Sequence, residues 1–184
     1  MFFLTPVAVI IILLIHFDIG RPYLFIQIRP GKHEKPFKFI KFRTMNNLRD
    51  KNNQLLPDKY RLTKLGRFLR KSSLDEIPSF INVLFGQMSL VGPRPLLVEY
   101  LELYDINQSK RHLVKPGITG WAQINGRNNI SWEEKFKLDL WYIQNQSFWL
   151  DIKILFLTLP IVLKKKGISY SDNATMHKFK GTKS

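Results

Sequence analysis

Two adjacent carboxylates, Asp75 and Glu76, come directly after the most basic part of the chain. Residues 21–71 contain fifteen lysines and arginines against three acidic residues, a net charge of +12. In such a setting a carboxylate can attack phosphorus as a nucleophile or hold a metal ion that faces phosphates. The pair is therefore a candidate site for phosphate chemistry.

The same pair also fits an ordinary helix start. Ser73-x-x-Glu76 has the spacing of a capping box, Ser72-x-x-Asp75 fits nearly as well, and acidic residues in a first turn complement the helix dipole. Pro78 is tolerated in a first turn but not deeper in a helix. We expect a helix that begins near Ser73. Because exposed N–H groups at that end favour phosphate, the cap and the site are compatible.

The charge of the whole chain points to an anionic partner. The chain has 184 residues, enough for one domain, and a formal charge of +15. Nucleic acid, anionic lipid headgroups and nucleotide-like substrates all satisfy that charge. The sequence contains no cysteine, which excludes disulfides and a cysteine-based zinc site. Its four histidines show no ligand spacing, so a metal site would use oxygen ligands, as Mg2+ prefers.

Residues 1–17 are almost wholly apolar. A cleaved signal peptide fits poorly, because the run lacks a basic beginning and a small-residue cleavage site. A transmembrane helix needs about 20 residues, which puts this run at the short limit. A re-entrant helix, bent at Thr5 and Pro6, enters and leaves on the same side, and the residues alone support it as well as a span. The basic residues that follow are expected on the cytoplasmic side.

The rest of the chain alternates short helical and extended patterns. Residues 149–163 predict either a helix lying in the membrane interface or a buried core helix. Residues 23–28 and 37–42 predict a hairpin, and residues 46–59 a loop. Helices are expected over residues 60–71 (basic and amphipathic), 77–85, 96–104 and 132–143, followed by a loosely held polar tail.

Two loops are rich in glycine and proline. In residues 86–95, Arg94 stands between two prolines, whose restricted backbone lowers the entropy cost of aiming a guanidinium at phosphate. A turn with an exposed arginine explains the loop equally well. In residues 115–128, Gly126 and Arg127 offer backbone donors and one cation. Neither loop matches a P-loop or a dinucleotide fingerprint.

Five short segments follow one another along the chain: Lys-Phe-Arg-Thr-Met (41–45), Ser-Leu-Asp-Glu-Ile-Pro (73–78), Phe-Ile-Asn-Val-Leu (80–84), Met-Ser-Leu-Val-Gly-Pro-Arg-Pro (88–95) and Pro-Gly-Ile-Thr-Gly-Trp-Ala-Gln (116–123). As a set they resemble the bacterial sugar transferases, which are monotopic polyprenyl-phosphate phosphoglycosyl transferases. The resemblance extends from about residue 5 to residue 167. Within the family, the chain is most similar to the small members that begin protein N-glycan assembly in Campylobacter-like bacteria.

The resemblance implies that a phospho-sugar moves from a UDP-sugar to undecaprenyl phosphate, with release of UMP. It places the family's acidic dyad on Asp75 and Glu76. Asp75 would be the nucleophile that forms a covalent phospho-sugar aspartate, and Glu76 the metal or acid–base partner. Mg2+ would bridge the dyad and the diphosphate. The implied donor carries an N-acetylated amino sugar such as diacetylbacillosamine.

The resemblance also implies roles for residues outside the dyad. Arg94 would hold phosphate. Asp151 matches a recurrent family acid and is grouped with the substrate-binding candidates, although its exact role stays open. Thr5 and Pro6 match the family's bend in a re-entrant helix, which favours that interpretation over a span. Weaker candidates for phosphate or uridine contacts are Lys41, Arg70, Arg111 and Arg127.

Together these inferences predict an α-rich α+β fold. Residues 1–20 would form a re-entrant membrane helix, residues 21–167 a cytoplasmic catalytic domain with a small β-hairpin and amphipathic interfacial helices, and residues 168–184 a polar tail. The expected location is the cytoplasmic face of the bacterial inner membrane, at the first membrane step of glycoconjugate assembly. Oligomeric state stays open. The rivals are a non-catalytic membrane scaffold and a tethered nucleic-acid-binding module, although the chain lacks a recognisable nucleic-acid motif.

Overall fold

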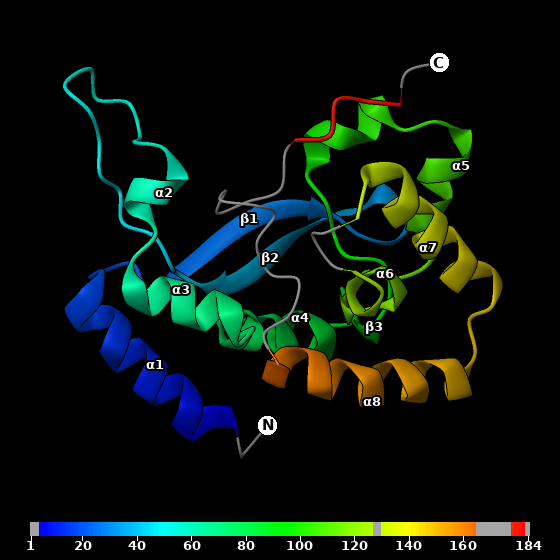
Figure 1. The fold of residues 1–184 in the computed structure, drawn as a ribbon, viewed down its shortest axis with the longest axis horizontal. Helices are drawn as coiled ribbons and strands as arrows, with labels where there is room; N and C mark the ends of the chain where they lie inside the picture. Colours follow the sequence, from blue (N-terminus) through cyan, green and yellow to red (C-terminus); the bar gives the residue numbers. More distant parts are fainter. Residues whose placement is uncertain (1–3, 127–129, 165–177, 183–184) are drawn as a thin grey trace.

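A small antiparallel hairpin and a short parallel strand pair are surrounded by helices in the computed structural model, which describes residues 4–126, 130–164 and 178–182 (Figure 1). The hairpin joins β1 (Leu24–Pro30) to β2 (Pro36–Phe42) through the 3-10 turn η1 (Lys32–Glu34), and Leu24 pairs with Phe42. The parallel pair is β3 (Ser89–Val91) and β4 (Gly117–Thr119). The predicted hairpin and helix-rich α+β class are confirmed.

The helical elements are mostly short. They are α1 (Leu4–Asp18), α2 (Asp58–Arg61), α3 (Lys64–Lys71), η2 (Leu74–Ser79), α4 (Phe80–Leu84), η3 (Val98–Leu103), α5 (Ile106–Ser109), η4 (Lys110–Leu113), α6 (Trp121–Ile124), α7 (Trp132–Gln144) and α8 (Phe148–Lys164). The single helix expected over residues 60–71 is wrong. Thr63 has extended backbone and its hydroxyl accepts from the Gly66 N–H at 2.9 Å, so a new helix, α3, begins there. The helix expected over residues 96–104 is a 3-10 helix.

Helix α1 packs one apolar stripe onto β2 and α3. Ile11 and Ile15 are buried against Phe42 of β2 and Leu69 of α3. With 15 residues, α1 is about 22 Å long. Within the described residues, no helix combines the length and apolar character needed to cross a membrane. The bend expected at Thr5 and Pro6 is not confirmed, because both lie in the first turn of α1 and residues 1–3 are outside the description.

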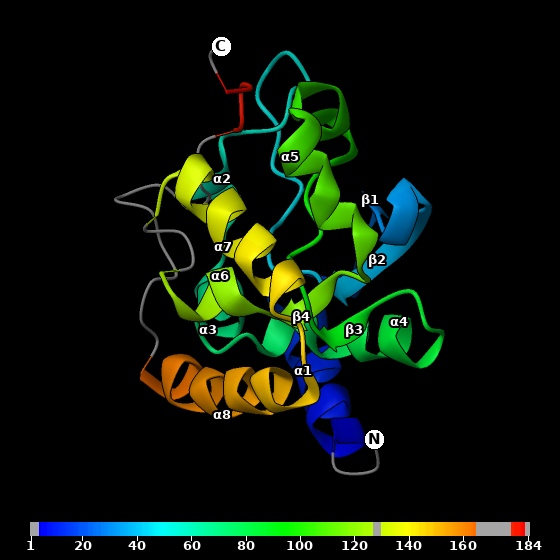
Figure 2. The ribbon, with the colours of Figure 1, turned by 90° about the vertical axis from the view of Figure 1, so that its right-hand side faces the viewer.

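Helices α1 and α8 lie along the same side of the molecule (Figures 1 and 2). Ile154 of α8 is fully buried in a cluster with Val91 and Tyr142. The opposite side of α8 exposes apolar residues, among them Trp149 at 77% and Phe156 at 69%. Residues 149–163 therefore form a helix with one side in the core, as a core helix requires, and one exposed apolar side, as an interfacial helix requires.

A second apolar cluster fixes α7 and the end of the chain. Phe136 of α7 packs with Leu96, Tyr100 and Phe179. Phe179 is only 4% exposed, so the loose tail predicted from the polar composition is wrong at this residue. This cluster holds α7 beside the loop that carries Arg94.

Candidate active site

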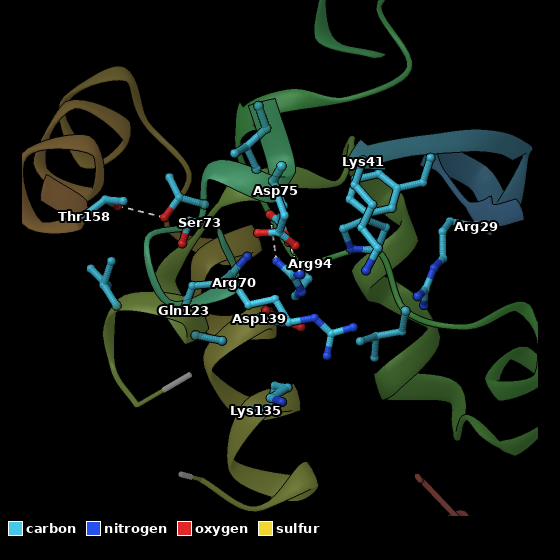
Figure 3. Close-up of a pocket in the computed structure, with 18 of the residues that line it drawn as sticks. Arg29, Lys41, Arg70, Ser73, Asp75, Arg94, Gln123, Lys135, Asp139 and Thr158 are labelled. Carbon is cyan, nitrogen blue, oxygen red and sulfur yellow. Dashed lines mark hydrogen bonds and ion pairs between the residues drawn. The ribbon is translucent and has the colours of Figure 1, made fainter. Parts of the chain in front are cut away.

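A cavity of about 430 Å³ lies among η2, the hairpin, α6, α7 and the inner side of α8 (Figure 3). Its volume is that of a small-molecule site. The charged residues lining it are Arg29, Lys41, Arg70, Arg94 and Lys135 on the basic side, and Asp75, Glu76 and Asp139 on the acidic side. The excess of positive charge suits an anionic ligand.

The first turn of η2 presents the acidic dyad. Ser73, directly before η2, has a left-handed backbone (φ +56°), a strained conformation that is concentrated at functional sites. The helix predicted to begin near Ser73 is confirmed, because Ser73 is the N-cap of η2. The predicted capping box is wrong, because the Ser73 side chain makes no capping hydrogen bond and the Ser72 hydroxyl donates to Phe68 O at the end of α3. Instead, the Ser79 hydroxyl donates to Glu76 O at 2.6 Å and holds the turn.

Asp75 is a buried carboxylate among cations. Its exposed fraction is 6%, and burial, followed by the charge of Glu76, raises its pKa to about 6. Lys41, Arg94 and Arg70 act in the opposite direction. Asp75 is therefore mostly ionised at neutral pH and faces a cavity lined by basic groups, as a nucleophile toward phosphorus requires.

Glu76 and Arg94 form a two-point ion pair. Arg94 Nη1 donates to Glu76 Oε2 at 3.2 Å, and Nη2 donates to Oε1. The carboxylate raises the pKa of Arg94. The structure thus brings the dyad and Arg94 together, as the sequence predicts, and adds a direct contact between two of them.

Close backbone packing fixes the loop that carries Arg94. The Gly92 N–H donates to Thr119 O at 2.9 Å, and the Gly117 N–H donates to Pro93 O at 3.0 Å. A Cβ atom on Gly117 would overlap the backbone of Gly92, so only glycine permits this approach. The two glycine- and proline-rich loops therefore form one structural unit, which fixes the position of the Arg94 backbone.

Arg111 lies behind Arg94 and does not line the cavity. Its Nη2 donates to Asp139 Oδ2 at 2.7 Å and to Arg94 O at 2.8 Å, and its Nη1 donates to the Tyr104 hydroxyl at 3.3 Å. The Arg111 and Asp139 side chains are each 2% exposed. The structure thus places Arg111 as a buried support for the Arg94 backbone, away from the predicted phosphate or uridine contact.

Lys41 and Arg70 do line the cavity. Arg70 Nε donates to the Thr44 hydroxyl at 3.0 Å, which ties α3 to the segment after β2. The Lys41 ammonium lies 5.2 Å from the centre of the Phe25 ring. Burial lowers the pKa of both basic groups, and the charge of Asp75 partly restores it. Both residues are thus cations directed toward the dyad.

Of the last two predicted residues, only Asp151 lies within the described part of the chain, and the structure does not bring it to the cavity. Asp151, in the first turn of α8, accepts from the Tyr142 hydroxyl at 2.8 Å and joins α8 to α7. It is not among the cavity-lining residues. Arg127 lies outside the described residues, so its predicted role stays a prediction.

The donor set of the dyad fits Mg2+. This ion is usually held by one or two carboxylates together with substrate phosphates. Asp75 and Glu76 supply two carboxylates beside a basic cavity. In the described part of the chain, no cluster of three or more His, Cys, Asp or Glu residues could hold a metal. Substrate oxygens would complete the coordination.

The cavity also contains two cations that the sequence analysis did not single out. Lys135 of α7 is 8% exposed, and its ammonium lies 4.6 Å from the centre of the Trp132 ring. Arg29 lies near the end of β1 and donates to Gln27 Oε1 at 2.7 Å. A signal for Lys135 does exist in the sequence. It shares the helical spacing i, i+4, i+7 with Asp139 and Tyr142, which puts two charges on a buried side of α7.

Comparisons with known proteins identify the family of the chain. The family model described as "Bacterial sugar transferase" matches residues 1–165. The uncharacterised sugar transferase EpsL of Bacillus subtilis (strain 168) is 56% identical, over 98% of this chain and 91% of that protein. The UDP-glucose:undecaprenyl-phosphate glucose-1-phosphate transferase of Escherichia coli (strain K12) is 45% identical, over 85% of this chain and 36% of that protein. The undecaprenyl-phosphate galactose phosphotransferase of Salmonella typhimurium is 39% identical, over 80% of this chain and 35% of that protein. The chain thus spans about a third of these two longer relatives.

Proposed function

The chain belongs to the bacterial sugar transferase family, and we propose that it transfers a sugar 1-phosphate from a UDP-sugar to undecaprenyl phosphate and releases UMP. One observation carries the proposal: the buried Asp75 carboxylate faces a cavity lined with basic side chains. The undecaprenyl phosphate acceptor is supported by two relatives, whose names describe transfer of glucose 1-phosphate or phosphogalactose to this lipid.

The proposed chemistry has two displacements at one phosphorus atom. An Asp75 oxygen attacks the phosphorus that bears the sugar, and the bond to the bridging oxygen breaks, so that UMP leaves with the electron pair. An oxygen of undecaprenyl phosphate then attacks the same phosphorus and releases the Asp75 carboxylate. Covalent catalysis of this kind divides one difficult step into two easier ones. Lys41, Arg70 and Arg94 offset the repulsion between the carboxylate and the phosphates.

In this proposal the dyad also holds Mg2+. Asp75 and Glu76 would bind the ion together with diphosphate oxygens, and the ion would neutralise phosphate charge. Arg94 already orients the Glu76 carboxylate, which would therefore be a positioned ligand when the ion binds.

The proposed location is the cytoplasmic face of the inner membrane. The outer side of α1 exposes Ile10 at 57% and Phe17 at 85%, and α8, which lies along the same side of the molecule, has an exposed apolar side of its own. Exposed apolar surface on these two helices supports a membrane-binding face. We propose that α1 enters the bilayer as a re-entrant helix and that α8 lies in the interface. This would keep the enzyme in the plane of its lipid acceptor.

The sugar is the least constrained part of the proposal. An N-acetylated amino sugar is the choice that the sequence resemblance favours, whereas the relatives' names specify glucose and galactose. In each case the reaction would be the first membrane step of glycoconjugate assembly, because it creates the lipid-linked sugar.

A UMP-release assay tests the proposal. The full chain, in lipid nanodiscs with undecaprenyl phosphate and Mg2+, is given a panel of UDP-sugars that includes glucose, galactose and N-acetylated amino sugars. We expect UMP release with at least one donor, dependence on the lipid, and loss of release in Asp75→Asn. The matched control is Asp50→Asn, in an exposed loop outside the cavity. Absence of release with every donor, or full turnover by Asp75→Asn, would reject the mechanism.

A further inference from the structure

The end of α4 exposes two consecutive large apolar side chains, Leu84 at 66% and Phe85 at 77%. Helix α4 directly follows η2, the turn that presents the acidic dyad. It ends before Gly86, whose backbone is left-handed (φ +70°), and Gln87 is exposed as well. We call residues 84–87 the α4 tip. Leu84 and Phe85 contribute little to the core of the chain, because most of their surface is outside it.

Hydrogen bonds fix the α4 tip in this exposed position. The Gln87 and Met88 N–H groups donate to Asn82 O at 2.9 and 3.2 Å, and Asn82 Nδ2 donates to Gln87 Oε1 at 2.7 Å. Asn82 is 1% exposed, and its Nδ2 also donates to Lys38 O of β2 at 2.8 Å. An inward turn of the tip would break buried hydrogen bonds. The exposure of the two apolar side chains is therefore part of the folded structure.

Helix α4 lies on the side of the molecule that α1 and α8 occupy. In Figure 1, α4 lies just above α8, and in Figure 2, α1 lies between α8 and α4 along the lower side. Exposed apolar residues on α1 and α8 are the basis of the membrane location proposed above. The α4 tip adds a third apolar point on the far side of α1 from α8. Three points that do not lie on one line fix the orientation of a rigid body on a surface.

Basic charge accompanies the α4 tip. Lys115, which is exposed, has its Nζ 3.5 Å from the position that a Cβ atom on Gly86 would occupy. Residues 77–98, which include α4 and the tip, contain no aspartate or glutamate. An aromatic ring beside a lysine suits the membrane interface, where the ring enters the boundary of the acyl chains and the ammonium meets anionic headgroups.

We propose that the α4 tip is a third membrane contact, in which Leu84 and Phe85 enter the interface of an anionic bilayer and Lys115 lies among the headgroup phosphates. The inference rests on the membrane location proposed above. A second copy of the chain or a partner protein on the tip would explain the exposed side chains, but not why the tip shares one side of the molecule with α1 and α8.

This contact would set the height of the dyad above the lipid. Helix α4 follows η2 without a connecting loop, and the Ser79 hydroxyl at their junction donates to Glu76 O at 2.6 Å. Asp75 and Phe85 therefore belong to one connected unit. With the tip seated among the headgroups, the cavity would stay at the level of an acceptor phosphate, which lowers the entropy cost of bringing the two together.

Spin labels on introduced cysteines test the contact, because the chain has no cysteine of its own. The full chain is reconstituted in vesicles of phosphatidylcholine and phosphatidylglycerol. A nitroxide on Phe85→Cys is compared with one on Phe156→Cys, on the exposed side of α8, and one on Ile106→Cys, which is 85% exposed on the distant α5 (Figure 1). Electron paramagnetic resonance then measures collisions with oxygen, which enters lipid, and with a water-soluble nickel complex.

We expect oxygen collisions to exceed nickel collisions at residues 85 and 156, and the reverse at residue 106. Leu84→Cys should behave like Phe85→Cys and serves in its place if that variant does not fold, as judged by circular dichroism. Lys115→Gln should increase the access of nickel to the label at residue 85. The matched control, Lys51→Gln in an exposed loop, should leave that access unchanged.

The outcomes separate the α4 contact from the proposed function. Free access of nickel to residue 85, with residue 156 in lipid, overturns the contact and leaves the proposed location intact, whereas free access to both rejects the location as well. A label at residue 85 that is shielded from both reagents indicates a protein on the tip, and spin–spin broadening would identify it as a second copy; either result overturns the contact. Lipid exposure of residue 85 in a chain that releases no UMP supports the contact and rejects the proposed reaction.

Discussion

The Arg94 guanidinium binds both carboxylate oxygens of Glu76, the residue next to the buried Asp75. Two adjacent carboxylates raise each other's pKa, and a cation beside them lowers it again. Arg94 counteracts the rise in the pKa of Asp75 that burial and Glu76 cause. Arg94 thus orients the Glu76 carboxylate and, by its charge, favours the ionised form of Asp75.

Arg94→Lys tests the geometric part of this relationship. Lysine keeps the positive charge but cannot bind both carboxylate oxygens in the planar arrangement. We expect kcat/KM for UMP release to fall about 10- to 100-fold, which corresponds to about 1.4 to 2.7 kcal/mol. The melting temperature should change little, because the Arg94 side chain is 43% exposed and partly exposed ion pairs contribute little stability. Wild-type kcat/KM in this variant, with Arg49→Lys as control, would show that charge alone suffices.

Asp75→Asn distinguishes a catalytic carboxylate from a helix cap. We expect no detectable UMP release and, at pH 7.5, a melting temperature equal to or a few degrees above that of the unaltered chain. The reason is that the buried environment disfavours the ionised carboxylate, as its raised pKa indicates. A capping residue would instead lose about 1 kcal/mol of stability on substitution. Thermal melts beside the activity assay decide between them, with Asp50→Asn as the control.

The pH dependence of the reaction follows from the same carboxylate. UMP release should rise as the pH passes through about 6, because the nucleophile must be ionised. Stability should move the other way. The pKa of Asp75 is raised from 3.8 to about 6, so the folded chain binds more protons than the unfolded chain between these values. The stabilisation of the folded chain by protonation of Asp75 is therefore fully present below about pH 4, and it is lost as the pH rises through about 6. The difference in melting temperature between Asp75→Asn and the unaltered chain should therefore grow in favour of the variant over this range.

The hairpin and the long helices could be predicted from local patterns. Two short apolar and aromatic runs on either side of a polar segment predict β1 and β2, and the patterns over residues 132–143 and 149–163 predict the helices α7 and α8. The break at Thr63 was missed, because the amphipathic pattern continues across it while the backbone does not. The capping box at Ser73 is wrong for a related reason, since residue spacing does not predict the left-handed backbone of Ser73.

The residues around the dyad could be identified only from the tertiary structure. The sequence identifies Arg94 as a candidate, but it cannot show that Arg111 supports the Arg94 backbone or that Lys135 lies near Arg94 on α7. These residues lie between 17 and 41 positions from Arg94 along the chain. Family resemblance gives Arg111 a candidate role and gives Lys135 none, whereas the structure places Arg111 behind the wall of the cavity and Lys135 in that wall.

Removal of divalent ions tests the metal proposal. The dyad offers only two carboxylates, so an ion bound there would be held weakly without substrate phosphates. We expect EDTA to abolish UMP release and added Mg2+ to restore it within the assay mixing time. Because the ion is not expected to hold the fold together, EDTA should leave the melting temperature of the free chain unchanged. Full turnover after exhaustive chelation would remove the metal from the mechanism.

The buried ion pair between Arg111 and Asp139 gives the most demanding stability prediction. Both side chains are 2% exposed and 2.7 Å apart, so removal of one partner leaves a buried charge without its counter-charge. We expect Asp139→Asn and Arg111→Met each to lower the free energy of unfolding by about 3–5 kcal/mol. The control is Asp58→Asn, whose pair with Arg61 is partly exposed and should contribute less than about 1 kcal/mol.

The double variant Arg111→Met with Asp139→Leu separates stability from positioning. Replacing both charges by apolar groups of similar volume avoids the stranded charge, so most of the lost stability should return in denaturant melts. Activity should not return, because Arg94 O then loses the donor that holds its loop at 2.8 Å. We expect kcat/KM to stay at least 10-fold low while the melting temperature recovers. Recovery of both quantities together would show that the pair is purely structural and that the glycine contacts alone aim Arg94.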